Sequence, residues 1–338
     1  MIRDLLGRPL KNLRLSVTDR CNLRCSYCMP EAEYVWLPRR DLLQFEEMST
    51  LVDVFTQAGV DRVRVTGGEP LLRRDLPELI RMIARKPAIR DLALTTNGVM
   101  LAEHAGALRD AGLHRITISL DTLRPDRFQA LTRFDSLAQV LTGIDEAAKH
   151  FGTVKLDAVI IRGTNDDELV PLLEYAKRVG GELRFIEYMD VGGATMWSHE
   201  RVMSRQEMLA ALASEYGTIT PVVESTSAPA DRFRLADGTI FGIISSTTDP
   251  FCSSCDRSRL TADGMWYRCL YATTGTDLRT PLRAGMSREH LLEVLAREWT
   301  SRADRGAEER LAIRDRSPLV PASSLKKNPH LEMHTRGG

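Results

Sequence analysis

Predicted strands alternate with helical segments six times through the first 187 residues of this 338-residue chain. Short apolar and β-branched runs predict strands at 13–17, 63–65, 92–94, 116–120, 154–160 and 183–186. Apolar residues at helical spacing fill the intervals, as in 137–148. Such alternation indicates βα units on a parallel sheet. Six units are too few for a closed eight-fold barrel, which leaves an open partial barrel or a doubly wound sheet.

Three later segments carry signals for the start of a helix. Asn165 is followed three residues on by Glu168, and Ser204 by Glu207, which is the spacing of a capping box. A third helix is expected over 287–299. These signals predict helices that begin at 165, 204 and 287.

The βα pattern ends near residue 188. Asp237-Gly238 and Asp263-Gly264 each lie between β-rich flanks, which predicts two hairpins. The C-terminal part of the chain is therefore expected to be α+β rather than a further series of βα units.

Charge and hydropathy exclude several classes of protein. Lys and Arg total 46, as do Asp and Glu, so bulk charge does not hold this chain on nucleic acid or on an acidic membrane. No apolar run reaches the 18–20 residues of a membrane span, and the N-terminus lacks the apolar stretch of a secretory signal. The expected location is cytoplasmic, where thiols stay reduced. Six cysteines there indicate a metal or redox role.

The cysteines form two compact triads with none left over. The spacings are C-x3-C-x2-C at Cys21, Cys25 and Cys28, and C-x2-C-x13-C at Cys252, Cys255 and Cys269. Structural zinc nearly always takes four ligands, and neither triad has a fourth Cys or a His beside it. Three thiolates on a [4Fe–4S] cluster leave one iron open for a ligand. A zinc knuckle remains the alternative for the second triad, which lies among the predicted hairpins.

Several motifs resemble those of the radical S-adenosylmethionine (SAM) superfamily. They are CNLRCSYC at 21–28, TGGEP at 66–70, TTNG at 95–98 and SLD at 119–121. The last three follow the second, third and fourth predicted strands, where ligands bind in α/β folds. More narrowly, the chain is similar from about residue 4 onward to the GTP 3′,8-cyclase family of molybdenum cofactor biosynthesis. The second triad and the terminal Gly337-Gly338 carry this narrower resemblance.

The resemblance implies a fold and a set of cofactors. The fold is an α/β, TIM-like partial (βα)6 barrel over 1–220, with an α+β region over 221–338 that carries the second cluster and caps the open side. The cofactors are two [4Fe–4S] clusters and SAM. The open iron of the first cluster holds SAM, and that of the second binds the guanine of GTP.

The resemblance also implies site residues. Gly68 contacts the methionine moiety of SAM, Ser119 its polar groups, and Tyr27 and Met189 its adenine. The expected GTP contacts are Arg14, Arg64, Thr95, Lys155, Arg257, Ser258 and Arg259. Arg257, Arg259, Gly337 and Gly338 are expected to take part in catalysis.

Elementary chemistry offers support and a plainer alternative for these residues. Strand alternation places Arg257 and Arg259 on one face, where guanidinium groups suit a triphosphate, although a solvated strand face has the same pattern. No P-loop motif is present to do this instead. Glycines 337 and 338 could thread a narrow channel, or they could be a frayed end. Arg336 departs from the apolar or small residue typical before the glycine pair.

The expected reaction is removal of the C3′ hydrogen of GTP, closure of C3′ onto C8, and reduction to the cyclic dihydroguanosine triphosphate. Expected partners are an external one-electron donor, cyclic pyranopterin monophosphate synthase as the next enzyme, and a second copy of the chain in a homodimer. Two alternatives stay open. One is another two-cluster radical SAM enzyme that acts on a peptide or small molecule, and the other is a zinc- or iron-binding structural or electron-carrier module.

Overall fold

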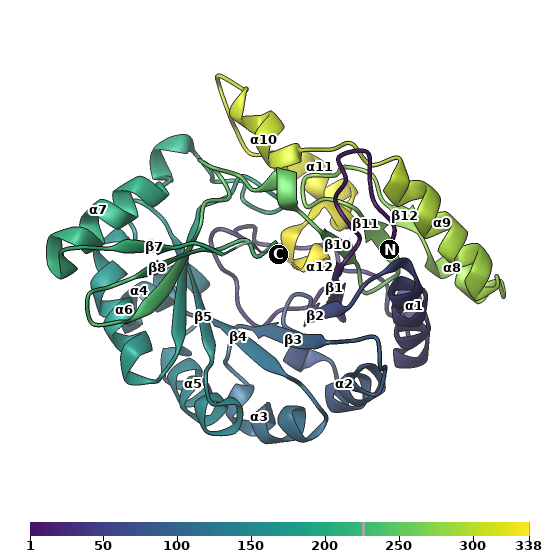
Figure 1. The fold of residues 1–338 in the computed structure, drawn as a ribbon, viewed down its shortest axis with the longest axis horizontal. Coiled ribbons are helices and arrows are strands. Elements are labelled where there is room, and N and C mark those ends of the chain that lie inside the picture. Colours follow the sequence, from purple (N-terminus) through teal and green to yellow (C-terminus); the bar gives the residue numbers. More distant parts are fainter. Residues whose placement is uncertain (225–226, 338) are drawn as a thin grey trace.

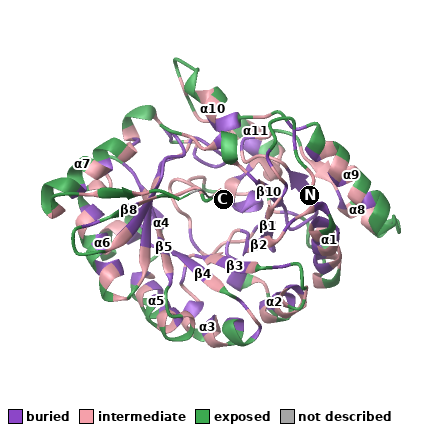
Figure 2. Cartoon of the chain, viewed as in Figure 1, coloured by how far each residue is buried: buried purple, intermediate pink, exposed green. Residues whose placement is uncertain are grey.

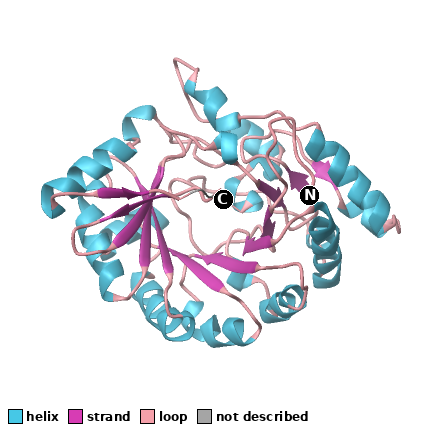
Figure 3. Ribbon diagram, in the orientation of Figure 1, coloured by secondary structure: helices cyan, strands magenta, loops and turns pink. Residues whose placement is uncertain are grey.

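The computed structural model of the chain describes residues 1–224 and 227–337. Figure 1 shows strands arranged around an open ring, with helices along its outer side, and Figure 3 separates the two kinds of element by colour. The ring is formed by one sheet, so the architecture is an α/β barrel that does not close.

The six predicted strands are confirmed. They pair in parallel, in chain order, as β1 (Asn12–Ser16), β2 (Arg62–Thr66), β3 (Asp91–Thr96), β4 (Arg115–Ser119), β5 (Lys155–Ile160) and β6 (Glu182–Glu187). The helices between them are α1 (Phe45–Ala58), α2 (Leu76–Ala84), α3 (Leu101–Asp110), α4 (Pro125–Thr132), α5 (Leu137–Phe151) and α6 (Leu169–Arg178). Their outward faces are exposed and their inward faces buried against the strands (Figure 2).

Strands from the C-terminal region extend this sheet at both edges. β9 (Ile240–Ile244) pairs in parallel with β6, and β10 (Arg257–Leu260) pairs in parallel with β1. Antiparallel strands lie outside them: β8 (Asp231–Arg234) and β7 (Thr220–Val222) beside β9, then β11 (Met265–Tyr267) and β12 (Thr276–Asp277) beside β10. Within the described residues, β7 and β12 end the strand order without pairing to each other, which confirms the predicted partial barrel. The boundary at residue 220 stays a prediction, because one continuous sheet contains strands from both sides of it.

Both predicted hairpins are confirmed. Gly238 lies in the turn between β8 and β9, and Gly264 in the turn between β10 and β11, each with φ +87°. A left-handed backbone of this kind favours glycine over any residue that carries a Cβ.

Two of the three predicted helix starts are confirmed. Ser204 and Glu207 form a reciprocal capping box before α7 (Arg205–Tyr216). The Ser287 hydroxyl accepts the His290 N–H at the start of α9 (Arg288–Thr300). The remaining helices are α8 (Arg279–Arg283), α10 (Gly306–Leu311), α11 (Ala322–Lys327) and α12 (Met333–Arg336).

The predicted capping box at Asn165 and Glu168 is wrong. The buried Asn165 side chain instead accepts the Ile161 N–H at 2.8 Å and donates to the Asp121 carbonyl at 2.7 Å, which ties the ends of β4 and β5 together. Glu168 accepts the Leu123 N–H at 2.7 Å. Because both side chains serve the neighbouring loops, the segment Asp166–Glu168 is a 3₁₀ turn and α6 begins only at Leu169.

Strand alternation directs polar side chains into the barrel. In β1, Leu13 and Leu15 are fully buried in the core, while Arg14 between them lines the interior cavity. β10 repeats the pattern, with Arg257 and Arg259 at the cavity and Leu260 in the core. β1 and β10 therefore contribute three arginine side chains to the cavity lining.

Candidate active site

One cavity inside the barrel brings the two cysteine triads together. The first triad lies on the loop that follows β1; Cys252 and Cys255 precede β10, and Cys269 follows β11. All six thiols are free, and all six residues line the same cavity at the carboxyl ends of the central strands. Residues about 230 positions apart in the chain thus form one site.

The chemistry of these thiols suits an iron–sulfur cluster. Burial raises the pKa of Cys21 and of Cys269 to about 11. Burial also opposes ionisation of Cys255, yet the guanidinium groups of Arg257 and Arg302 bring its pKa down to about 7. Buried thiolates need a cationic partner, which iron supplies.

The described residues place no three Cys, His, Asp or Glu side chains where they could bind one metal ion together. That finding concerns single ions. Each thiolate of a [4Fe–4S] cluster binds a different iron atom, so both donor sets fit this group in kind.

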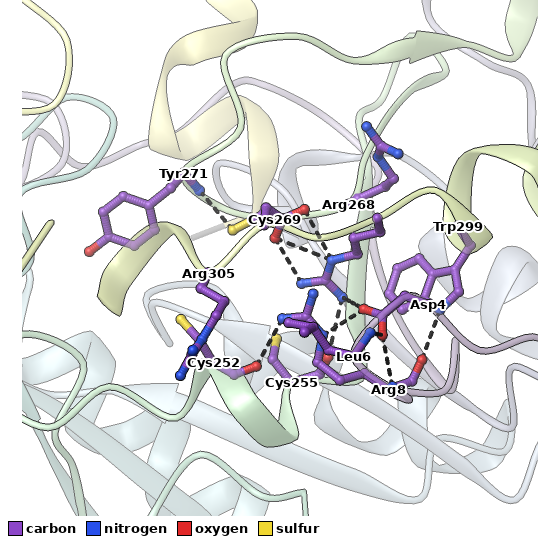
Figure 4. Close-up of polar contacts among 12 residues, drawn as sticks. Asp4, Leu6, Arg8, Cys252, Cys255, Arg268, Cys269, Tyr271, Trp299 and Arg305 are labelled. Atoms are coloured by element: carbon purple, nitrogen blue, oxygen red, sulfur yellow. Dashed lines mark hydrogen bonds and ion pairs between the residues drawn. The ribbon is translucent and has the colours of Figure 1, made fainter. Parts of the chain in front are cut away.

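Two buried arginines donate hydrogen bonds to backbone carbonyls of the second triad, and Figure 4 labels one of them, Arg8, beside Cys252. Arg8 donates to the Cys252 carbonyl at 2.9 Å and forms a 2.6 Å ion pair with Asp4. Arg302 donates to the Cys255 carbonyl at 3.2 Å. The Trp299 indole N–H donates to the Arg8 carbonyl at 3.1 Å. Sequence reasoning missed these residues, because nothing in the chain near Asp4 or Arg302 signals a nearby cysteine loop.

The predicted SAM contacts all line the cavity: Tyr27, Gly68, Ser119 and Met189. Tyr27 belongs to the loop of the first triad, whereas Met189 packs with the hydrophobic cluster that contains Cys252. The Tyr27 hydroxyl donates to Asp121 Oδ2 at 2.6 Å, and Oδ1 of the same carboxylate accepts the Val159 N–H at 2.8 Å. Burial raises the pKa of Asp121 to about 6. This carboxylate, which the sequence motif contained without a role, fixes the orientation of Tyr27.

Gly68 lies where only glycine fits. A Cβ there would come within 2.2 Å of the Arg20 carbonyl oxygen, and the Gly68 N–H donates to the Thr18 carbonyl at 2.9 Å. The close approach is therefore to the loop after β1. Next to it, the buried Glu69 accepts from Thr96 Oγ1 and from the Asn97 N–H, both at 2.7 Å, and burial raises its pKa to about 7. Glu69 joins the ends of β2 and β3 around the cavity.

Three arginines lie in one row across adjacent strands. The register pairs Arg14 of β1 with Arg259 of β10 on one side and with Arg64 of β2 on the other. Burial, followed by the repulsion of neighbouring guanidinium groups, lowers the pKa of Arg259 to about 10 and that of Arg64 to about 9. Arg14 and Arg259 line the cavity, and like charges held together there indicate a site for an anion.

The predicted GTP contacts divide between the cavity and its surroundings. Arg14, Thr95, Arg257 and Arg259 line the cavity. Arg64 donates to Thr95 Oγ1 at 2.9 Å, so it lies behind Thr95 and does not itself line the cavity.

The other two predicted contacts lie elsewhere. Lys155, at the start of β5, forms a 2.9 Å ion pair with Glu182, and Ser258 is buried without lining the cavity. One cavity group that the sequence did not signal is Asp157, whose Oδ1 accepts from Arg184 Nε at 2.7 Å.

The C-terminal segment enters the barrel (α12, Figure 1). The Gly337 carbonyl accepts from Arg259 at 2.5 Å and from Arg14 at 3.2 Å. A Cβ on Gly337, whose φ is +65°, would lie 2.2 Å from Cγ2 of Thr66. Gly338 lies outside the described residues. The tail thus reaches the arginines that the sequence assigned to the substrate.

The contacts of Arg336 explain how an arginine is accommodated where a small or apolar residue is usual. Its guanidinium donates to the carbonyls of Leu270 and Ala272 at 2.9 and 2.6 Å, and lies 4.1 Å from the centre of the Tyr267 ring. It fastens the tail to the loop that follows Cys269.

Comparison with known families is consistent with this site. The Radical SAM superfamily model matches residues 15–176, and the Molybdenum Cofactor Synthesis C model matches residues 181–308. The structure of SuiB from Streptococcus suis bound to S-adenosylmethionine superposes with a TM-score of 0.59 at 13% identity, covering 91% of this chain and 68% of that chain. The open barrel and the C-x3-C-x2-C loop after its first strand thus define a radical SAM protein.

Sequence relatives narrow the class further. GTP 3′,8-cyclase 3 of Mycobacterium bovis is 57% identical over 342 residues, covering all of this chain and 90% of that protein. GTP 3′,8-cyclase 1 of Mycobacterium tuberculosis is 54% identical, covering 100% and 95%. GTP 3′,8-cyclase of Aquifex aeolicus is 46% identical, covering 100% of both chains. The chain belongs to the GTP 3′,8-cyclase family.

Among the residues described, every helix is too short or too polar to cross a bilayer.

Proposed function

We propose that this chain converts GTP to (8S)-3′,8-cyclo-7,8-dihydroguanosine 5′-triphosphate, the first step of molybdenum cofactor biosynthesis. The observation that carries the proposal is the placement of both cysteine triads and of Arg14, Arg257 and Arg259 around one cavity. Family membership supports it, because relatives that match over the full chain carry this activity in their names.

The residues that would hold the cofactors follow from the site. The loop after β1 would hold one [4Fe–4S] cluster through Cys21, Cys25 and Cys28, and the loops around β10 and β11 would hold the other through Cys252, Cys255 and Cys269. Three thiolates on each cluster leave one iron for an outside ligand. When bound at the first triad, SAM supplies the 5′-deoxyadenosyl radical that removes the 3′-hydrogen of GTP.

The chain's own residues bind, orient and enclose the reactants. Tyr27, held by Asp121, and Met189 would border the adenosyl group. Arg14, Arg257 and Arg259 would bind the triphosphate, since guanidinium forks match phosphate oxygens. The tail at Gly337 would close this side of the cavity and keep water from the reacting atoms.

Arg257 offers the most direct test of the anion site. Its guanidinium is 4.4 Å from the centre of the Phe251 ring, and its buried Nη2 has no hydrogen-bond partner within the described chain. We expect Arg257→Ala to weaken GTP binding about ten- to a hundred-fold, the value of one charge-assisted contact, and to leave SAM affinity unchanged. Isothermal titration of the reconstituted protein measures both. Because Arg257 also favours the thiolate of Cys255, iron analysis of the same sample must show that the second cluster is retained.

Arg268→Ala is the matched control for this test. Arg268 precedes Cys269 in the chain, but it donates to Ser301 Oγ at 3.1 Å and does not line the cavity. If the two variants and the unmodified chain bind GTP with equal affinity, Arg257 does not contact GTP and only packs against its neighbours.

Metal content tests the two-cluster basis of the proposal. We expect about eight iron and eight sulfide atoms per chain after anaerobic reconstitution, because each triad binds one [4Fe–4S] cluster. Cys21→Ala should halve both numbers and abolish SAM cleavage. One tightly bound zinc with half of the iron would contradict the second cluster.

Product analysis with GTP and SAM then distinguishes a GTP cyclase from an enzyme that acts on a peptide. Consumption of SAM distinguishes either enzyme from an electron carrier.

The same proposal includes an electron donor, a downstream enzyme and a cellular location. An external one-electron donor would reduce the first cluster, and cyclic pyranopterin monophosphate synthase would consume the product. Six free cysteines in one cavity favour a reducing, cytoplasmic location. Assembly as a homodimer stays a prediction from the resemblance.

A further inference from the structure

His334 is a buried polar side chain that the proposed reaction leaves without a role. It lies in α12, is 3% exposed and lines the cavity. Within the described chain neither ring nitrogen has a hydrogen-bond partner, and the nearest carboxylate oxygen, Glu332 Oε2, is 4.0 Å from Nδ1. A buried donor left unsatisfied costs about 1–3 kcal/mol. A bound group that accepts a hydrogen bond from this imidazole would remove that cost.

The surroundings of His334 place it on the side of the first triad. Its ring packs edge-on against Tyr34 and Trp36, with centroids 5.3 and 5.6 Å away. Both aromatic residues belong to the segment that follows Cys28. The backbone of His334 also favours the ionised form of the Cys28 thiol, which lowers its pKa against the opposing effect of burial. The imidazole is thus packed among residues close to Cys28, and His334 is one of the residues that line the cavity.

We propose that His334 donates an N–H hydrogen bond to the iron–sulfur cluster held by Cys21, Cys25 and Cys28, and so raises its reduction potential. An imidazole carries at least one N–H in either charge state, and the cluster's sulfur atoms are acceptors. Hydrogen bonds to these sulfurs are among the factors that set the potential of such clusters, and a donor stabilises the more negative, reduced state. The inference rests on the proposed function, because it requires the first cluster.

The position of His334 gives this contact a consequence for the reaction. Three residues further along the same tail, the Gly337 carbonyl accepts from Arg259 and Arg14 of the anion site. A displacement of α12 would therefore disturb both the arginines and the first cluster. The external donor would pass its one electron to this cluster most readily when the tail is docked.

The test compares three substitutions in the reconstituted full chain by EPR-monitored redox titration without SAM. His334→Phe keeps the edge-on packing and removes both nitrogens. We expect it to disfavour reduction of the first cluster about tenfold, a shift of about −59 mV for one electron. His334→Gln and His334→Asn each place an amide N–H near one ring nitrogen, and one of them should restore the potential.

Two controls make the outcome specific. The second cluster, identified by the signal that Cys252→Ala removes, should keep its potential in every variant. His330→Phe alters a histidine of the same tail whose Nε2 already lies 2.7 Å from Asp263 Oδ2, and it should change neither potential.

Three results would overturn the assignment: an unshifted first cluster in His334→Phe, an equal shift in both clusters, or a shift that appears only after SAM is added. The last would assign the contact to SAM. A preparation that assembles no SAM-responsive cluster at all would instead contradict the proposed function.

Discussion

Cys252→Ala is expected to abolish GTP cyclisation and to leave SAM cleavage measurable. Cys252 belongs to the triad that would hold the guanine-binding cluster, whereas the cluster that would bind SAM takes its thiolates from the loop after β1. Loss of one of three thiolates should remove the second cluster, and with it about half of the iron. The first cluster keeps all its ligands, so 5′-deoxyadenosine should still form without cyclic product. Chromatography of both products, with iron analysis of the same sample, measures the effect.

Cys21→Ala is the reciprocal variant. It should lose SAM cleavage and retain an EPR signal that GTP perturbs. The pair distinguishes two cooperating clusters from one catalytic cluster plus a structural metal. If the second triad held structural zinc, Cys252→Ala would unfold its region, because the binding energy of such a site is folding energy. Circular dichroism that shows lost structure in Cys252→Ala, with Cys21→Ala unaffected, would therefore contradict the proposed role.

The barrel could be predicted because its signals are local. Each strand of the βα series shows as a short apolar run, and the Asp-Gly turns mark the hairpins. The order of the strands in the sheet is a different kind of information. β10 pairs with β1, although Leu13 and its partner Ser258 are 245 positions apart. No local pattern encodes that pairing, yet it alone brings the second triad to the first.

The sequence also could not predict how far along the barrel axis each inward-facing side chain lies. Alternation places Lys155 and Asp157 on one face of β5, but only Asp157 lines the cavity. Lys155 is the first residue of the strand, at the opposite edge from the cysteine loop, and Glu182 on the neighbouring strand neutralises it. Periodicity gives the face of a side chain and not its level along the barrel axis.

Polar residues with several possible partners were the hardest to interpret. Asn165 matched a capping signal, but its side chain lies within reach of the Ile161 N–H and the Asp121 carbonyl, and tertiary contacts prevail over a local cap. Arg336 departs from the small or apolar residue that is typical before the glycine pair. Its guanidinium bonds to Leu270 and Ala272 show that it replaces apolar packing with a fixed set of donors.

Deletion of Gly337 and Gly338 is expected to lower cyclisation about a hundred-fold or more while the fold and both clusters persist. The Gly337 carbonyl takes hydrogen bonds from Arg259 and Arg14. Its loss removes the contact to Arg14 and leaves Arg259 with the Arg336 carbonyl, 3.1 Å away, at a new chain end, so both guanidinium groups can shift within the cavity. Displacement of a reactant by about an ångström can cost a hundred-fold in rate. GTP should still bind, and the first cluster should still cleave SAM. Comparing 5′-deoxyadenosine with cyclic product in one assay measures this uncoupling.

A point substitution at Gly337 tests the same tail without shortening it. In Gly337→Ala the new Cβ would lie 2.2 Å from Cγ2 of Thr66, in a left-handed backbone that alanine disfavours. We expect uncoupling as in the deletion. Thr66→Ser removes Cγ2, so the double variant Gly337→Ala/Thr66→Ser should regain part of the activity if steric displacement of the tail is the cause. Full cyclisation in Gly337→Ala alone, or in the deletion, would show that the tail merely rests in the barrel. Because rescue requires a contact between the tail and β2, a frayed chain end cannot produce it.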